Sequence, residues 1–228
     1  RSPMPAPARA LYDWHARPGA FQRLVPPWDD IEVVEQQGGV EDGGRNVFRI
    51  HQGPIAVRWE ALHRDHVEGE QFVDVQVSGP FGGWEHTHRF LEDGPESSIL
   101  DDRIQYRMPV GALGDLAGGW AAAGTLERMF TFRHERTRRD LLRHQRYADR
   151  PRMTVAITGP SGLVGSELAP FLTTAGNTVV PLVRGEAGPG QLPWRPLDGS
   201  ALPAGLPGVD AVVHLAGENI GRGRWTPA

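Results

Sequence analysis

The chain has 228 residues, of which 39% are hydrophobic and 23% charged, and a formal net charge of −4. This length and composition are typical of a soluble globular protein with one large or two small domains, and the slightly acidic balance argues against a nucleic-acid partner, because phosphate contacts need clustered positive charge. Cysteine and lysine are both absent, which excludes disulfides, thiolate metal sites, cysteine nucleophiles and Schiff-base chemistry.

No apolar run approaches the roughly 20 residues that a membrane-spanning helix needs, and the amino terminus lacks the apolar core of a signal peptide. We therefore expect a cytoplasmic protein with no membrane span. The chain opens with "RSPMPAP" and has no initiating methionine, and we expect it to be truncated at both ends.

The first part of the chain alternates polar and apolar residues in short segments joined by turn sequences such as "GPFGG" and "EDGPE". Short helical segments broken by proline precede them, and a long helix from about Leu116 to Tyr147 follows. The alternation predicts strands at 31–36, 46–51, 55–63, 71–78, 84–90 and 98–108. This spacing favours an antiparallel meander.

The pattern changes after a polar linker at 148–153. From there the residues predict a strand, a helix, a second strand and a later strand, and strands that alternate with helices imply a parallel sheet. The predicted elements are strands at 153–158, 178–183 and 211–215 and a helix at 163–175. We place the domain boundary near residue 150, which gives domains of 1–150 and 151–228.

Gly159, Gly162 and Gly165 form a GxxGxxG pattern between the first of these strands and the helix. In a dinucleotide-binding turn the first glycine permits a tight turn, the second lets the backbone approach the pyrophosphate, and the third lets helix and strand pack closely. The alternative, an ordinary loop, is disfavoured by the strand and helix on either side.

The phosphate donors in such a turn are free N–H groups at the start of the helix. Pro160 has no N–H, so we expect the donors to be the backbones of Leu163 and Val164, with the hydroxyl of Ser161 beside them.

Arg184 ends the second strand of this part, where a fold that binds NAD would carry an acidic residue. An arginine there pairs with a 2′-phosphate, which favours NADP over NAD. The alternative is an exposed arginine with no ligand. Leu215, Ala216 and Gly217 end the later strand, where a cofactor ribose could lie against the backbone.

The segments "TGPSGLVG", "PLVRG" and "DAVVHLAGENIGRGRWT", together with Trp194, resemble the extended or atypical short-chain dehydrogenase/reductase superfamily, in particular its sugar-nucleotide epimerase-like branch. The resemblance covers about residues 152–228. It implies an incomplete α/β Rossmann domain, the amino-terminal half of an NAD(P)-binding fold, and NADP-dependent redox chemistry.

The segments "WHARPGAFQRLVPPW", "HTHRF" and "LERMFTFRHERTRRDL" resemble the START-like superfamily of polyketide cyclases and lipid-transport proteins. This resemblance implies an α+β helix-grip fold, in which a curved sheet wraps a long helix around an apolar cavity for a hydrophobic small molecule. Some epimerase-like proteins carry such a domain in front.

Short-chain dehydrogenases usually act through a Tyr-x-x-x-Lys pair, and this chain departs from that pattern. Lysine is absent, and the tyrosines, Tyr12, Tyr106 and Tyr147, all precede the glycine-rich turn. We therefore assign no catalytic residue and expect an inactive fragment of an NADP-dependent oxidoreductase or epimerase that acts on a sugar nucleotide or another hydroxyl or carbonyl compound. The alternative is a non-catalytic carrier or sensor of a hydrophobic molecule. A third alternative makes the first domain a cyclase or hydrolase, which would need a histidine and a carboxylate that converge in its cavity.

His86 and His88 share one strand face, and His63 and His66 form a second pair. Zinc binding would need the pairs to converge, for which the sequence gives no reason, so we expect no metal site. The ordinary interpretation is packing against aromatic rings or exposure to solvent, and the alternative places His86 and His88 in the cavity wall. Adjacent acids such as Asp101 and Asp102 point to opposite sides and are poor candidates for paired acid/base work.

Overall fold

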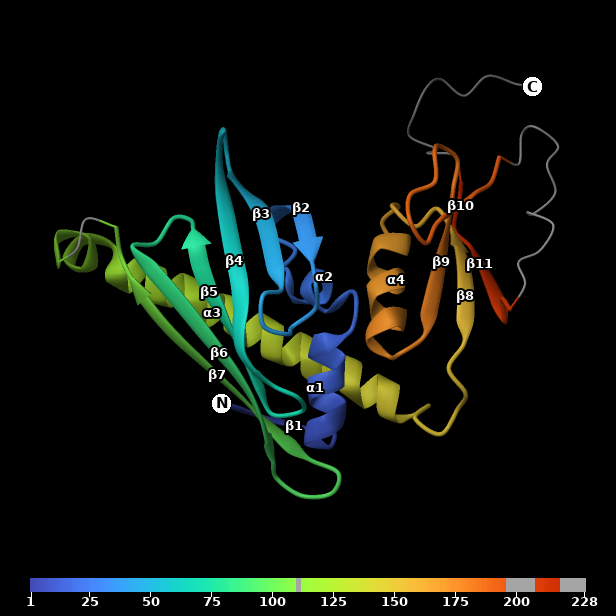
Figure 1. Ribbon diagram of the computed structural model, residues 1–228, viewed down its shortest axis with the longest axis horizontal. Helices are drawn as coiled ribbons and strands as arrows, with labels where there is room; N and C mark the ends of the chain where they lie inside the picture. Colours follow the sequence, from blue (N-terminus) through green and yellow to red (C-terminus); the bar gives the residue numbers. More distant parts are fainter. Residues whose placement is uncertain (110–111, 196–207, 218–228) are drawn as a thin grey trace. The chain divides into compact units, whose positions relative to one another are not determined.

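The computed structural model describes residues 1–109, 112–195 and 208–217 (Figure 1). Trp225, at the end of the segment "DAVVHLAGENIGRGRWT", lies outside the described residues. The chain forms two compact units, residues 1–150 and 151–228. None of the helices in the described part is long and apolar enough to cross a membrane.

The first unit is built on a seven-stranded sheet in the order β1-β7-β6-β5-β4-β3-β2. Its strands are β1 (Ser2–Met4), β2 (Asp30–Gln37), β3 (Arg45–Gln52), β4 (Ile55–Val67), β5 (Gln71–Ser78), β6 (Gly83–Glu92) and β7 (Ser98–Arg107). From β2 to β7 each strand pairs antiparallel with the next, so the expected meander is confirmed. Sequence analysis missed β1, which pairs with β7 through Ser2 and Leu100.

The described residues of this unit also form the helices α1 (Ala8–Ala16), α2 (Ala20–Leu24) and α3 (Ala112–Gln145). The main apolar core lies where α1 meets the sheet, with Leu11 and Trp14 fully buried against a group drawn from several elements. That group includes Met4, Tyr12, Phe72, Phe90, Leu100 and Leu141. Figure 1 shows α3 running along the sheet, and Phe130 and His134 of α3 contact β6 and β7.

The second unit contains a parallel sheet in the order β10-β9-β8-β11. Its elements are β8 (Thr154–Thr158), α4 (Gly165–Thr174), β9 (Thr178–Val183), β10 (Leu192–Pro193) and β11 (Ala211–His214). The neighbours of β8 lie on opposite sides, β9 on one and β11 on the other. In open parallel sheets, ligands bind at the carboxyl ends of strands where the order changes side, and in this sheet that point is the end of β8.

Candidate functional sites: a histidine–aspartate network and a glycine-rich turn

Strand β6 turns a row of large side chains toward the inside of the first unit. Burial alternates along the strand, as the two-residue period of a half-buried strand requires. The buried positions are Trp84, His86, His88 and Phe90. The two histidines are 3% and 6% exposed, so polar groups on neighbouring strands must satisfy their ring nitrogens.

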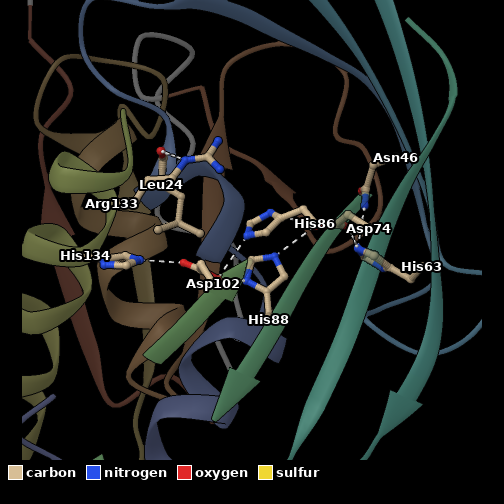
Figure 2. A network of polar contacts seen from close by, with 9 residues as sticks. All are labelled: Leu24, Asn46, His63, Asp74, His86, His88, Asp102, Arg133 and His134. Atoms are coloured by element: carbon tan, nitrogen blue, oxygen red, sulfur yellow. Dashed lines mark hydrogen bonds and ion pairs between the residues drawn. The ribbon is translucent and has the colours of Figure 1, made fainter. Parts of the chain in front are cut away.

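The pairing of the strands supplies those partners. His86 stands directly opposite Asp74 of β5, and His88 stands opposite Asp102 of β7. Asp74 in turn stands opposite His63 of β4. Because residues directly opposite on one sheet face have neighbouring side chains, the register of these strands brings three histidines and two aspartates together (Figure 2).

Asp74 is surrounded by imidazoles. Its Oδ1 lies 2.6 Å from Nε2 of His63, and its Oδ2 lies 3.0 Å from Nε2 of His88 and 3.8 Å from Nδ1 of His86. The Nδ1 of His63 lies 2.7 Å from the carbonyl oxygen of Gly39, to which it donates. His63 is thus oriented by the backbone and presents Nε2 to the carboxylate.

Asp102 binds the opposite edges of the same two rings. Its Oδ1 lies 3.1 Å from Nε2 of His86 and 2.8 Å from Nδ1 of His88. The second contact is an ion pair without the alignment of a hydrogen bond. His134 of α3 lies 2.7 Å from Oδ2, and its Nδ1 contacts the hydroxyl of Ser2 at 2.7 Å.

Two adjacent imidazoles in this network have pKa values shifted in opposite directions. Burial alone would lower the pKa of His88, but the negative charges of Asp102 and Asp74 and the hydrogen bond to Asp74 raise it to about 9. Burial and the charge of His88 lower the pKa of His86. At neutral pH a cationic ring therefore lies beside a neutral one, with ring centroids 3.8 Å apart.

The carboxylates remain ionised despite burial. Burial would raise the pKa of Asp74, but hydrogen bonds from His63 and His88 hold it well below its ordinary value. The same opposition acts on Asp102, where the charges of His88 and His86 prevail. Arg133 of α3 adds a further buried cation, whose pKa burial lowers; its Nε donates to the carbonyl oxygen of Leu24 at 3.1 Å.

The expectation that the two histidine pairs do not converge is wrong for His63, because His63, His86 and His88 all contact Asp74. His66 stays apart, with Nε2 2.8 Å from the Tyr12 hydroxyl. Asp102 also has a partner set that sequence reasoning missed. The alternation of polar and apolar residues along β6 does indicate that both histidines point inward.

Asp101 and Asp102 make separate contacts. Asp101 pairs with Arg1 and Arg103, both at 3.0 Å. The two adjacent acids therefore contact different partners, and only Asp102 belongs to the network.

The glycine-rich turn of the second unit follows β8 directly. Gly159 has a φ of +65°, and a Cβ on it would lie 2.9 Å from backbone atoms of Leu215 and Ala216. A Cβ on Gly165 would lie 2.3 Å from the carbonyl oxygen of Gly159, and one on Gly162 would lie 3.3 Å from the same oxygen. The first and third glycines leave no room for a side chain.

Thr158, which sequence analysis did not single out, joins the turn to the end of β11. Its Oγ1 accepts hydrogen bonds from the N–H groups of Leu215 and Ala216, both at 3.0 Å, and contacts Nδ1 of His214 at 2.8 Å. The two loops at the carboxyl ends of β8 and β11 are therefore held side by side.

The expected ligand contacts of this turn are open to solvent. Leu163 is 89% and Val164 57% exposed, and neither N–H donates to an acceptor among the residues described. Ser161, Ala216 and Gly217 are exposed as well.

Arg184 follows β9 and is exposed. Its side chain forms no ion pair within the described ranges.

The sequence matches the family described as polyketide cyclase / dehydrase and lipid transport over residues 4–130. A crystal structure of a nucleoside-diphosphate sugar epimerase from Corynebacterium glutamicum is similar over 96% of this chain and 46% of its own, with 33% identity and a TM-score of 0.78. A norcoclaurine synthase from Thalictrum flavum aligns with 63% of this chain and 92% of its own, at 12% identity and a TM-score of 0.51, which is a likeness of fold alone.

Among curated proteins, an epimerase family protein of Mycobacterium bovis is 47% identical over 75 residues, which is 32% of this chain and 25% of the relative. A human epimerase family protein is 43% identical over 68 residues, 30% of this chain and 22% of the relative. The chain thus spans about a quarter of the length of these relatives. The expected resemblance, a START-like part joined to an epimerase-like part, is confirmed.

Proposed function

Because the chain belongs to the polyketide cyclase / dehydrase and lipid transport family through residues 4–130, we propose that it joins a domain that binds a hydrophobic small molecule (1–150) to a nucleotide-binding domain (151–228). The second domain is the amino-terminal half of a Rossmann fold. Its sheet order places β9 and β11 on either side of β8, as at the switch point of dinucleotide-binding folds.

The observation that carries this proposal is the packing of the glycine-rich turn. Gly159 and Gly165 occupy positions that a Cβ would fill with backbone overlap, and the turn lies at the carboxyl end of β8, where the strand order changes side. A tight turn of this kind brings the start of α4 close to the strand and leaves N–H groups free for phosphate oxygens. The residues present therefore fit a dinucleotide.

We propose NADP as the nucleotide. The pyrophosphate would lie against Gly162, with the N–H groups of Leu163 and Val164 and the hydroxyl of Ser161 as donors. The exposed guanidinium of Arg184 would bind the 2′-phosphate by charge-assisted hydrogen bonds.

The ribose would lie beside Leu215, Ala216 and Gly217, which Thr158 holds near the turn. When bound, the nicotinamide supplies or accepts a hydride. This chain's own residues bind and orient the nucleotide.

The chain offers no Tyr-x-x-x-Lys pair, since it has no lysine and its tyrosines precede the turn. We propose that these residues alone bind nucleotide without turnover. For a longer protein that contains them, we propose NADP-dependent oxidoreductase or epimerase-like chemistry on a sugar nucleotide or another hydroxyl or carbonyl compound.

Calorimetric titration of the chain with NADP⁺ and NAD⁺ tests the nucleotide proposal. We expect saturable binding of NADP⁺, with NAD⁺ about tenfold weaker or more because it lacks the 2′-phosphate. Equal affinities would contradict the role of Arg184, and no binding of either would contradict the nucleotide site. Oxidation of NADPH by this chain with a carbonyl substrate would contradict the absence of turnover.

A cluster of aromatic rings favours a hydrophobic ligand in the first domain. Trp59, Phe81 and Trp84 lie with ring centroids 5.0 to 5.7 Å apart, and Tyr106 joins Phe81 at 5.7 Å. Trp84 adjoins His86 at 6.4 Å. A carrier or sensor would bind its ligand at the same aromatic cluster. Native mass spectrometry of the freshly purified chain tests for a co-purified apolar molecule, and the absence of such a molecule would count against this role.

A further inference from the structure

The histidine–aspartate network brings three possible metal-ligand atoms close together. They are Oδ2 of Asp74, Nδ1 of His86 and Nε2 of His88, and one ligand atom from each of the three residues lies within 4.8 Å of the others. We propose that Asp74, His86 and His88 bind one divalent zinc-like metal ion in the first domain.

The distances between these atoms suit such an ion. Two ligands at zinc bond lengths of about 2.0 to 2.1 Å in a tetrahedron are about 3.3 Å apart. The oxygen of Asp74 lies 3.0 Å from Nε2 of His88 and 3.8 Å from Nδ1 of His86, which bracket that value. An ion bound here would replace the proton that Nε2 of His88 shares with Oδ2 of Asp74, and that proton would be released to solvent.

The other ring nitrogens have the partners that metal-bound histidines require. Such an imidazole normally faces a carboxylate or carbonyl with its second nitrogen, which fixes its orientation. Asp102 accepts a hydrogen bond from Nε2 of His86 at 3.1 Å and faces Nδ1 of His88 at 2.8 Å, where the contact is an ion pair. His134 holds the second oxygen of Asp102 at 2.7 Å.

The second carboxylate oxygen of Asp74, Oδ1, is held by His63. Nε2 of His63 lies 2.6 Å from Oδ1, too close for both to bind one ion at tetrahedral angles, so His63 positions the carboxylate. The side chain of Asp74 is 24% exposed, so an ion would reach the cluster from the side of this carboxylate.

The donor set decides the class of ion and of site. Two imidazoles and one carboxylate, with no sulfur, suit zinc and related divalent first-row ions. Among the residues described, no fourth His, Asp or Glu joins the cluster. One tetrahedral position is left for water or a ligand oxygen, as in catalytic zinc sites.

The test uses the whole chain without a histidine tag, dialysed against a chelator and then against buffer. Titration with ZnCl₂ in a calorimeter should show about one ion per chain, and CoCl₂ should give the intense visible absorption of tetrahedral, nitrogen-ligated Co²⁺, which ZnCl₂ then abolishes. A wild-type chain that binds neither ion saturably would overturn the proposal.

Variants locate the site. His86→Gln should abolish saturable binding, and Asp102→Asn should weaken it about 10- to 100-fold through the loss of the outer carboxylate. His66→Gln is the matched control, because His66 belongs to the same sheet but contacts Tyr12; it should bind as wild type does. A loss in His66→Gln equal to that in His86→Gln would overturn the assignment.

Circular dichroism checks that each variant folds. If His86→Gln does not fold, the cobalt spectrum of the wild type decides, because a hydrogen-bonded network without a metal gives no tetrahedral absorption.

Discussion

Arg23 of α2 and Asp140 of α3 form a bidentate ion pair, with Nε to Oδ2 and Nη2 to Oδ1 both at 2.8 Å. Their side chains are only 5% and 1% exposed. Two parallel hydrogen bonds from a guanidinium to a carboxylate fix the orientation of both groups. This pair therefore sets how α2 lies on α3, and it does so out of contact with water.

Asp140→Asn should be strongly destabilising, because it removes the carboxylate charge that the buried guanidinium of Arg23 contacts. We expect the free energy of unfolding to fall by about 3 to 5 kcal/mol, measured by urea denaturation. The matched control is Glu135→Gln on the same helix, which breaks half-exposed pairs with Arg138 and Arg139 and should cost no more than about 1 kcal/mol. Equal losses would show that burial does not set the energy of the Arg23 pair.

The hydroxyl of Tyr12 should ionise late in an alkaline titration. Burial, followed by the charge of nearby Glu68, raises its pKa to about 12. The unfolded chain loses this proton first, near pH 10, so stability is fully present below about pH 10 and falls as the pH rises through about 12.

Tyrosinate absorbance measures this directly, because a chain without lysine or cysteine has few other groups that titrate in this range. Tyr12→Phe should remove a late phase that Tyr147→Phe, at a 64% exposed position, leaves in place. Persistence of that phase in Tyr12→Phe would contradict the assignment.

Gly165→Ala should damage the glycine-rich turn. Its methyl group would lie 2.3 Å from the Gly159 carbonyl oxygen and 2.8 Å from Cα of Pro160, and backbone atoms yield less easily than a flexible side chain. We expect a loss of about 1 to 3 kcal/mol in stability and much weaker NADP⁺ binding by calorimetry. Gly185→Ala is the control, since a Cβ there meets nothing within 4 Å; a similar loss in both variants would argue against a packing requirement at Gly165.

Arg184→Asp should reverse the nucleotide preference. A carboxylate accepts hydrogen bonds from a ribose 2′-hydroxyl and repels a 2′-phosphate, so NADP⁺ affinity should fall about tenfold or more while NAD⁺ affinity rises or holds. The ratio of the two dissociation constants is the measurement, and an unchanged ratio would remove Arg184 from the site.

The second unit should exchange its amide hydrogens faster than the first. β11 lies at an edge of its sheet, and Val212 on it is 46% exposed, so little apolar burial protects its hydrogen bonds. Hydrogen exchange followed by mass spectrometry should show slower exchange in β5 and β6. Equal protection in both units would contradict this.

Local patterns predicted the elements well, because alternation and turn residues are properties of short segments. The strands from β2 to β7 lie within a few residues of their predicted limits. The three residues of β1 carry too little periodicity to be recognised, and only pairing with β7 makes them a strand. Helix α4 begins at Gly165 and not at Leu163, because the turn ahead of it is closed by the Gly162 N–H donating to the carbonyl oxygen of Gly159 at 3.1 Å.

The two candidate sites differ in how far sequence could predict them. The glycine-rich turn is local, and its residues lie within one stretch of chain. The histidine–aspartate network depends on the pairing of several strands, which brings His63 of β4 and Asp102 of β7 to the two rings of β6. Alternation tells which residues share a face, but the sequence does not state the register between strands.

The dependence on register has a consequence for folding. A shift of β6 by one residue against its neighbours would turn His86 and His88 outward and bring the opposite set, which includes Glu85, Thr87 and Arg89, inside. Asp74 and Asp102 would then lose the two rings that lie between them. Buried carboxylates that lose hydrogen-bond partners are costly, so a misaligned sheet is destabilised by more than the loss of apolar packing. The network therefore favours one alignment of the strands, whichever ligand the first domain binds.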